Sequence, residues 1–331
     1  MSENGRHDTL GRIRIGTASW TDKSLIECGR FYPPEAKTAE ARLQFYASQF
    51  PIVEVDSSYY AMPAEHTAGL WVERTPDGFV FDIKAYALFT QHPTPPRSLP
   101  KDLREALPDE LGAKRNLYYR DLPASLQDEL WRRFAAALLP LDSAGKLGVV
   151  LFQFPKWFLP GRESRAYLAA LRERLPQYTP AVEFRNPLWL DAEHTPGTLA
   201  LLREHGYPFV CVDEPQGTPA SVPPIVAATA ETAVVRFHGR NAATWAARDV
   251  GVSAKYDYQY TDAELQGWLP GIEQLAEQSS DVHVLMNNCV EDKGIRNAQD
   301  LARLLREAPD VAPAVAPPRG EGQPAPQPRL L

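Results

Sequence analysis

AVEFRNPLWL, residues 181–190, begins as a strand buried on both faces and then carries two charges where such a strand should be apolar. Ala181, Val182 and Phe184 suit a buried strand. Glu183 and Arg185 lie two positions apart, so they point to the same side of it. Buried charges need partners, because removing them from water is costly. The stretch therefore predicts a parallel sheet with a polar end on its inner face.

Seven other short apolar or alternating segments accompany this strand. The eight predicted strands cover residues 13–17, 52–57, 79–84, 147–154, 180–185, 208–213, 233–238 and 282–287. Helical patterns alternate with them at 38–50, 64–75, 125–141, 164–175, 195–206, 261–278 (with a kink expected at Pro270) and 295–307. The connection between the sixth and seventh strands lacks one. This alternation predicts an α/β protein with a (β/α)8 TIM-barrel fold, and an open doubly wound sheet is the alternative.

The domain organisation follows from composition and spacing. Residues 12–308 form a single predicted barrel domain, residues 1–11 a flexible N-terminus, and the Pro-rich residues 309–331 a disordered tail. Two connections are long, 85–124 after the third strand and 239–260 after the seventh. Loops of this length in a compact domain are usually functional.

Composition excludes several classes of protein. The 331 residues are 44% hydrophobic, the formal charge is −7, and the three cysteines form no CxxC motif. A strongly basic nucleic-acid binder, a disulfide scaffold and a cysteine-rich zinc site are not indicated. The chain has no apolar run of the length that spans a membrane and no signal-peptide pattern at its start, so we expect a cytoplasmic protein without a membrane partner.

The period of two places polar residues on the inner face of every strand. Counted with Glu183 and Arg185, the inward set includes Glu54, Asp82 and Arg236, and the strands end on Thr17, Asp56, Lys84, Gln153, Arg185, Asp213, His238 and Asn287. A barrel that is apolar below and polar at the C-terminal ends of its strands is typical of a site at the C-terminal mouth. A structural ion network that fills the barrel is the alternative.

Acid and base chemistry is the reaction type that these residues suit best. The predicted catalytic groups are Glu54, Lys84, Glu183, Asp213 and His238. Paired carboxylates can divide acid and base roles, and histidine titrates near neutrality. Each has a structural alternative: His238 can be a hydrogen-bonded histidine, and Lys84 is more often an ion-pair partner than a Schiff-base lysine.

An anion site is predicted between the loops after strands seven and eight, where barrels often bind phosphate. Arginines and helix N-terminal amides suit a phosphate or carboxylate, and aromatic rings suit a sugar or base. The predicted substrate-binding residues are Trp20, Asp56, Tyr60, Gln153, Arg185, Trp189, Arg236, Gly239, Arg240, Asn287, Asn288, Arg296 and Asn297. Trp189 is expected to roof the opening.

No cofactor and no metal are expected. The sequence has no Walker loop, GxGxxG or GxSxG motif, and its histidines are scattered, which argues against a zinc site. Magnesium or manganese held by the acids stays open. The expected ligand is a small molecule or a phosphate-containing anion, and nucleic acid has weak support.

Several motifs together resemble the YecE-like family, domain of unknown function 72. They are RIRIGTASW, RFYPP, IVEVDSSYYAMP, WVERTPDGFVFDIKA, GKLGVVLFQFP, AVEFRNPLW, VVRFHGRN and NNCVEDKGIRNA, in order over about residues 12–307. The resemblance implies a TIM barrel and leaves the reaction open. It marks as motif residues Glu54, Tyr60, Lys84, Gln153, Glu183, Arg185, Trp189, His238, Gly239, Asn287, Asn288, Arg296 and Asn297.

Three functions remain in competition. The first is an enzyme, of hydrolase or isomerase type, that acts on a small anionic or polyhydroxylated substrate, a sugar- or phosphate-containing molecule, at the mouth by acid/base chemistry. The second is a nucleic-acid-binding or endonuclease-like barrel, which predicts a basic rim. The third is a non-catalytic protein that binds a small ligand.

Overall fold

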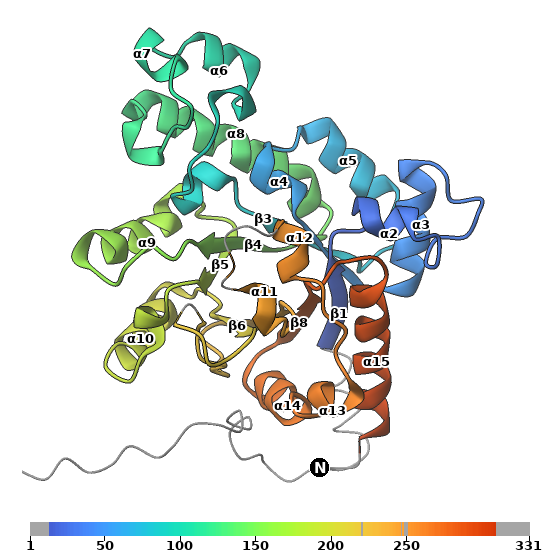
Figure 1. Cartoon of the computed structure of the whole chain (residues 1–331). Helices are drawn as coiled ribbons and strands as arrows, with labels where there is room; N and C mark the ends of the chain where they lie inside the picture. Colours follow the sequence, from blue (N-terminus) through green and yellow to red (C-terminus); the bar gives the residue numbers. More distant parts are fainter. Residues whose placement is uncertain (1–12, 220, 246, 248–250, 309–331) are drawn as a thin grey trace, which may run out of the picture.

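The computed structural model describes residues 13–219, 221–245, 247 and 251–308, and it contains the eight parallel strands that the sequence predicts. They are β1 Ile13–Ala18, β2 Ile52–Val55, β3 Val80–Lys84, β4 Leu147–Phe154, β5 Thr179–Phe184, β6 Val210–Asp213, β7 Thr232–Phe237 and β8 Asp281–Met286. Their order in the sheet is β5-β4-β3-β2-β1-β8-β7-β6, and a parallel bridge between Val182 and Phe209 joins β5 to β6. The strands therefore form a TIM barrel, and the open-sheet alternative is wrong (Figure 1).

Helices surround the strands as the alternation predicts (Figure 1). They are α2 Lys23–Glu27, α3 Ala39–Gln49, α4 Ser57–Tyr60, α5 Glu65–Glu73, α8 Ala124–Ser143, α9 Arg162–Arg174, α10 Thr195–His205, α13 Asp262–Gln266, α14 Leu269–Gln278 and α15 Lys293–Glu307, with the 3₁₀ turn η4 Pro187–Leu190 after β5. The predicted kink at Pro270 is a full break instead, and the proline lies in the first turn of α14, where its missing N–H costs nothing.

The two long connections carry short helices of their own. After β3 come η1 Ala87–Thr90, η2 Pro96–Ser98, α6 Lys101–Glu105, α7 Asp109–Gly112 and η3 Tyr119–Asp121, and α6 and α7 project from the barrel in Figure 1. After β7 come α11 Ala242–Trp245 and α12 Val252–Lys255. The predictions for residues 1–11 and 309–331 fall outside the described residues. No described helix is long and apolar enough to cross a bilayer.

The strand register shows which residues face the barrel axis. Glu54 pairs with Asp82, Gln153 with Glu183, and Val212 with Arg236, so these residues share the inner face. The predicted phase is thereby confirmed for β2, β3, β4, β5 and β7, and Asn287 after β8 also points inward, toward His238.

The predicted phase is wrong for β1 and β6. Ala18 is the neighbour of Glu54, so Thr17 faces outward, where its hydroxyl lies 2.9 Å from Tyr46 Oη of α3. Asp213 is the neighbour of Phe237, which packs on Trp268 in the helix layer, so Asp213 also faces outward. Both faces of a parallel strand are buried, and apolar alternation therefore does not distinguish inside from outside.

A buried ion pair fills the lower half of the barrel. His283 Nδ1 lies 2.9 Å from Asp82 Oδ2, and the backbone N–H of Val149 donates to Asp82 Oδ1 at 2.8 Å. Gly148 makes room for the pair, since a Cβ at this position would lie 2.2 Å from Asp82 Oδ1. Burial alone would lower the pKa of His283, but the carboxylates of Asp82 and Asp281 outweigh it and raise that pKa to about 9.

This pair predicts a loss of stability on the alkaline side. Because the pKa of His283 is raised on folding from 6.5 to about 9, the pair contributes fully below pH 6.5, and its contribution disappears as the pH rises through 9. We expect the free energy of unfolding to fall by roughly 3 kcal/mol over this range. Urea unfolding at a series of pH values measures it. Glu54, whose pKa is raised to about 8, adds to the slope below pH 8, so His283→Gln should remove the His283 part, which is clearest between pH 8 and 9. The exposed His66→Gln should keep the wild-type slope. A wild-type slope above pH 8 in His283→Gln would contradict the assignment.

Candidate functional site

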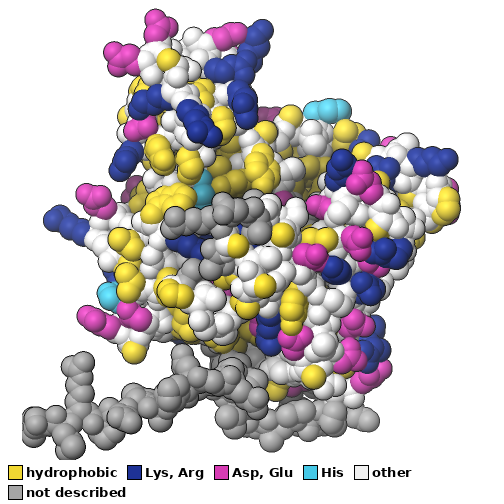
Figure 2. All heavy atoms as spheres, viewed as in Figure 1, with side chains coloured by type: hydrophobic (Ala, Val, Ile, Leu, Met, Phe, Trp, Pro, Cys, Tyr) yellow, Lys and Arg dark blue, Asp and Glu magenta, His cyan; other side chains and the backbone are white. Residues whose placement is uncertain are grey.

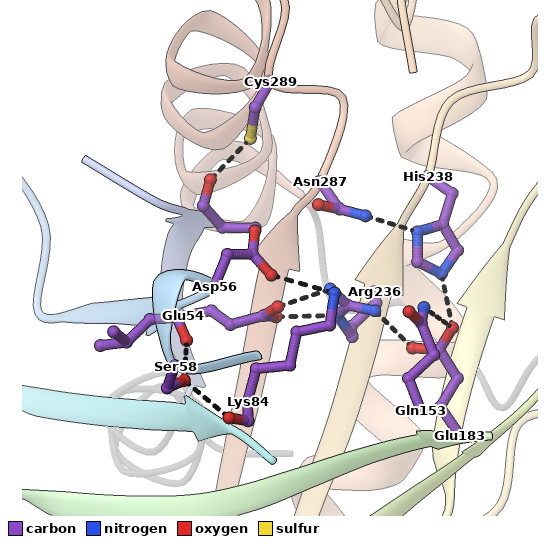
Figure 3. A network of polar contacts seen from close by, with 12 residues as sticks. Glu54, Asp56, Ser58, Lys84, Gln153, Glu183, Arg236, His238, Asn287 and Cys289 are labelled. Atoms are coloured by element: carbon purple, nitrogen blue, oxygen red, sulfur yellow. Dashed lines mark hydrogen bonds and ion pairs between the residues drawn. The ribbon is translucent and has the colours of Figure 1, made fainter. Parts of the chain in front are cut away.

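One arginine joins opposite sides of the barrel mouth. Arg236 of β7 donates Nε–H to Glu54 Oε2 at 2.8 Å and Nη2–H to Glu54 Oε1 at 2.6 Å, and its Nη1 contacts Glu183 Oε2 at 2.5 Å. All three side chains are fully buried. The strands β3 and β4 separate β2, which carries Glu54, from β5, which carries Glu183. Because Arg236 reaches both glutamates from β7, its guanidinium bridges the barrel interior (Figure 3).

Glu183 is the acceptor for four side chains. Besides Arg236, its Oε1 accepts from Gln153 Nε2 at 2.7 Å, from Arg185 Nη1 at 3.2 Å and from His238 Nε2 at 3.0 Å. Burial alone would raise the pKa of Glu183, but the charge of Arg236 and the other donors hold it well below its usual range. Glu183 is therefore a permanent carboxylate, and its lone pairs are occupied by protein groups.

His238 is a neutral hydrogen-bonded residue. Its Nδ1 lies 2.9 Å from Asn287 Nδ2, an N–H donor, and its Nε2 therefore carries the proton that is donated to Glu183. Burial, assisted by the charges of Arg185 and Arg236, lowers the pKa of His238 to about 3 despite the neighbouring Glu183. This geometry supports the structural alternative for His238 rather than the proton-transfer role.

The Asp56–Lys84 pair is the part of the network that solvent reaches. Lys84 Nζ lies 3.1 Å from Asp56 Oδ1, and the two side chains are 14% and 28% exposed. Burial would raise the pKa of Asp56, but the charges of Lys84 and Arg236 lower it overall. Burial would lower the pKa of Lys84, but Asp56 raises it, so Lys84 is an ammonium ion and an ion-pair partner.

Glu54 holds its proton more tightly than its neighbour Asp56. Burial and the charge of Asp56 raise the pKa of Glu54 to about 8, although Arg236 opposes the shift. Counting charges leads to the same result. Four carboxylates at the mouth face three cations, so one negative charge is left over: Glu54, Asp56, Glu183 and Glu214 against Lys84, Arg185 and Arg236. One proton in this cluster near neutral pH balances it.

Arg185 and Trp245 complete the mouth. Arg185 Nη1 lies 3.2 Å from both Glu183 Oε1 and Glu214 Oε2, and its guanidinium lies 5.0 Å from the centre of the Trp245 ring. Glu214 was not predicted. It follows β6 directly, and reading Val210 and Val212 as the inward residues of that strand would have found it.

Asp213 belongs to the helix layer and not to the predicted catalytic group. Its carboxylate accepts from Tyr260 Oη at 2.6 Å, from Trp268 Nε1 at 2.7 Å and from Arg240 Nη2 at 2.6 Å. The charge of Arg240 is therefore neutralised within the protein. A cavity of about 460 Å³ lies outside the mouth beside Asp213, Glu214, Arg240 and Glu264.

The other groups of the predicted anion site also bind one another. Gly239 N–H donates to Tyr260 Oη at 2.8 Å, and Asn288 Nδ2 donates to Asn297 Oδ1 at 2.9 Å. Gly239 has φ +86°, and a Cβ there would lie 2.8 Å from Tyr258 Cβ. Arg296 is on the outer helix α15, where it pairs with Asp292. These loops therefore offer few free donors to a ligand.

The aromatic predictions divide into two groups. Trp189 is fully buried in the outer layer, where it stacks on Phe184, and Trp20 packs edge-on against Trp71. Neither lines the mouth, and Trp245 takes the place predicted for Trp189. Tyr60 is 69% exposed at the end of α4, after β2. Since β/α loops alternate between core and rim positions, sequence alone does not separate these cases.

Among the residues that the structure describes, no group of three or more His, Cys, Asp or Glu side chains is arranged to hold a metal ion. The carboxylates of the mouth instead contact arginine, lysine and amide donors. The oxygens of Glu54 and Glu183 are thus already occupied.

Comparison with known proteins gives one consistent answer. The family model described as "Protein of unknown function DUF72" matches residues 14–321. The UPF0759 protein YunF of Bacillus subtilis (strain 168) is 33% identical over 297 residues, which cover 88% of this chain and 94% of that protein.

Solved structures of the same family are similar in fold. A DUF72 family protein from Enterococcus faecalis V583 has a TM-score of 0.73 at 26% identity and covers 90% of this chain and 97% of its own. One from Thermotoga maritima MSB8 has a TM-score of 0.69 at 28% identity, with coverage of 89% and 99%.

Replacing the bridging guanidinium should destabilise the barrel strongly. Arg236→Met leaves Glu54 and Glu183 buried without their charge partner, which should cost about 3–5 kcal/mol in the free energy of unfolding. The matched control, Arg132→Met, removes an exposed arginine and should cost less than about 1 kcal/mol. Adding Glu54→Gln and Glu183→Gln to Arg236→Met should recover part of the loss. Equal unfolding energies for Arg236→Met and the control would contradict the bridge.

His238 should stay neutral through the physiological pH range. Because its pKa lies at about 3, its imidazole ¹⁵N shifts should be flat from about pH 5 to 8 and should show a protonated Nε2. The resonance is assigned by its loss in His238→Gln. A titration midpoint near neutrality would instead restore His238 as a proton-transfer group.

Proposed function

This chain belongs to the DUF72 family of TIM-barrel proteins, and on that premise we propose that it is an enzyme that acts on a small anionic, polyhydroxylated substrate at the C-terminal mouth of the barrel. The observation that carries the proposal is the Asp56–Lys84 ion pair, which is partly exposed at the mouth beside the buried carboxyl group of Glu54. The pKa values of Glu54 and Asp56 are shifted in opposite directions, which supports it. Pairs of this kind divide acid and base roles in enzymes.

The roles follow from exposure and charge. Asp56 is a partly exposed carboxylate at neutral pH and is the group that can take a proton from a substrate. Glu54 lies behind it, has a pKa of about 8, and supplies a proton near neutrality. Glu183 and His238 hold Arg236 and Arg185 in position and do not exchange protons in this scheme.

The substrate class follows from the groups that line the opening. Lys84 and Arg185 are partly exposed cations whose pKa values lie above their usual range; burial would lower both, but neighbouring carboxylates outweigh it. They suit a carboxylate or phosphate. Gln153 and Tyr59 are also partly exposed and offer hydrogen bonds to hydroxyl groups. Because Lys84 stays protonated, it binds charge and does not form a Schiff base.

Binding and turnover can be tested separately. We expect glucose 6-phosphate to raise the unfolding temperature of the wild type more than glucose does, and Lys84→Met to lose this difference, because the ammonium ion is gone. Lys101→Met, an exposed lysine on α6, is the matched control. Differential scanning fluorimetry with a series of sugar phosphates and sugar acids gives the measurement, and equal responses to charged and neutral sugars would overturn the substrate class.

Proton abstraction is tested by deuterium wash-in. In D₂O the wild type should introduce deuterium into a bound sugar phosphate or sugar acid, as detected by ¹H NMR, and Asp56→Asn should bind the same ligand with at least a hundredfold slower exchange, on the order expected for loss of a general base. Binding without exchange or product in the wild type would instead identify a non-catalytic ligand-binding protein.

A further inference from the structure

Four aromatic rings form a row along the rim of the mouth. Tyr60 contacts Tyr59 edge-on with ring centres 5.0 Å apart, Tyr59 contacts His92 at 5.3 Å, and His92 contacts Trp157 at 5.6 Å. The rings come from the segments after β2, β3 and β4, which are neighbours in the sheet. Tyr60, Tyr59, His92 and Trp157 are called the aromatic row below.

Two rings of the aromatic row are unusually exposed for large aromatic side chains. Trp157 is 57% exposed and Tyr60 is 69% exposed, whereas the other six tryptophans, all among the described residues, are at most 8% exposed. Large exposed apolar groups that gather in one place mark binding surfaces. Figure 2 shows hydrophobic side chains gathered on this face, below the projecting α6–α7 region.

The row is held in place by hydrogen bonds. Trp157 Nε1 donates to the carbonyl oxygen of Gln91 at 3.3 Å, and His92 Nδ1 lies 2.8 Å from Thr90 Oγ1. Ordered rings lose little conformational entropy when a ligand binds, so the surface is prepared for stacking.

The second ring of the row, Tyr59, lies beside the reacting centre of the proposed function. Lys84 Nζ lies 5.3 Å from the centre of the Tyr59 ring, and the same ammonium ion pairs with Asp56. A ligand that is bound at Asp56 and Lys84 and is longer than one small molecule therefore extends over the row.

We infer that the aromatic row is a carbohydrate-binding subsite that stacks on the sugar rings of an oligosaccharide or glycoside whose end reaches Asp56 and Lys84. The inference rests on the proposed function, because it adds a second binding region to the same site. The apolar C–H faces of a sugar ring match aromatic faces, while its hydroxyl groups remain in water.

The charges of the row favour a sugar chain over a nucleic acid. Its four rings are uncharged at neutral pH, since burial and the charge of Lys84 lower the pKa of His92 to about 4. A polynucleotide brings one phosphate with each base and requires cations along its path, and the whole chain has a formal charge of −7.

Tryptophan fluorescence tests the subsite directly. Trp157 is the exposed tryptophan, so iodide should quench it selectively in the wild type. We expect at least one of cellotriose, maltotriose, xylotriose and chitotriose to protect it from iodide and to bind about tenfold more weakly to Tyr60→Ala by calorimetry. Trp157→Ala should also bind about tenfold more weakly. Tyr118→Ala, another exposed aromatic residue after β3, is the matched control and should bind as the wild type does.

The outcomes separate this inference from the proposed function. Trisaccharide binding that is lost in Trp157→Ala but retained in Lys84→Met supports the aromatic row, even if glucose 6-phosphate does not raise the unfolding temperature. Protection by short oligothymidylate and by none of the trisaccharides would overturn the sugar assignment in favour of a nucleic acid. Absence of protection by every probe, with glucose 6-phosphate binding intact, would overturn the subsite and leave the proposed function standing.

Discussion

The mouth of this barrel depends on one buried guanidinium ion. Arg236 is fully removed from water, and a charge in that environment persists only with partners that nearly surround it. Glu54 and Glu183 supply them from two other strands, which ties β2, β5 and β7 to one another across the interior. Every further polar contact of the mouth is arranged around this bridge, because each carboxylate oxygen left over needs a donor of its own.

The hydrogen bonds that complete the Arg236 bridge determine which polar groups of the mouth remain free to bind a substrate. Gln153, Arg185 and His238 all donate to Glu183, so this carboxylate and the imidazole have no free capacity for a substrate. The excess of acids over bases falls on the remaining carboxyl groups, and the pKa values of Glu54 and Glu214 are raised, chiefly by burial. In the proposed function, the reacting groups are therefore the Asp56–Lys84 pair at the solvent boundary.

The sequence was informative where a charge interrupted an apolar strand. Glu54, Glu183 and Arg236 alternate with large apolar residues that pack under the helices, and the strand pattern around them therefore identified the inward face correctly. The phases of β1 and β6 had no such marker. Their lower halves are apolar on both faces, and the polar residues near their ends, Thr17 and Asp213, are satisfied by tyrosines of the outer layer. Tryptophan serves equally in a core and at a rim, and Trp189 was assigned to the rim for the same reason.

A purely structural ion network would be buried to the same degree in the lower half of the barrel and at its mouth. If the charges served only to fill the barrel, apolar residues of similar volume would stabilise it as well or better. Every charged side chain would then also be buried and fully paired up to the C-terminal mouth. The lower pair, Asp82 and His283, fits that description because it is closed on all sides. The upper groups do not fit it, since the cations Lys84 and Arg185 and the acid Asp56 remain accessible beside a row of exposed rings. We therefore propose different explanations for the two layers of buried charge: the lower one stabilises the fold, and the upper one forms a surface for a ligand.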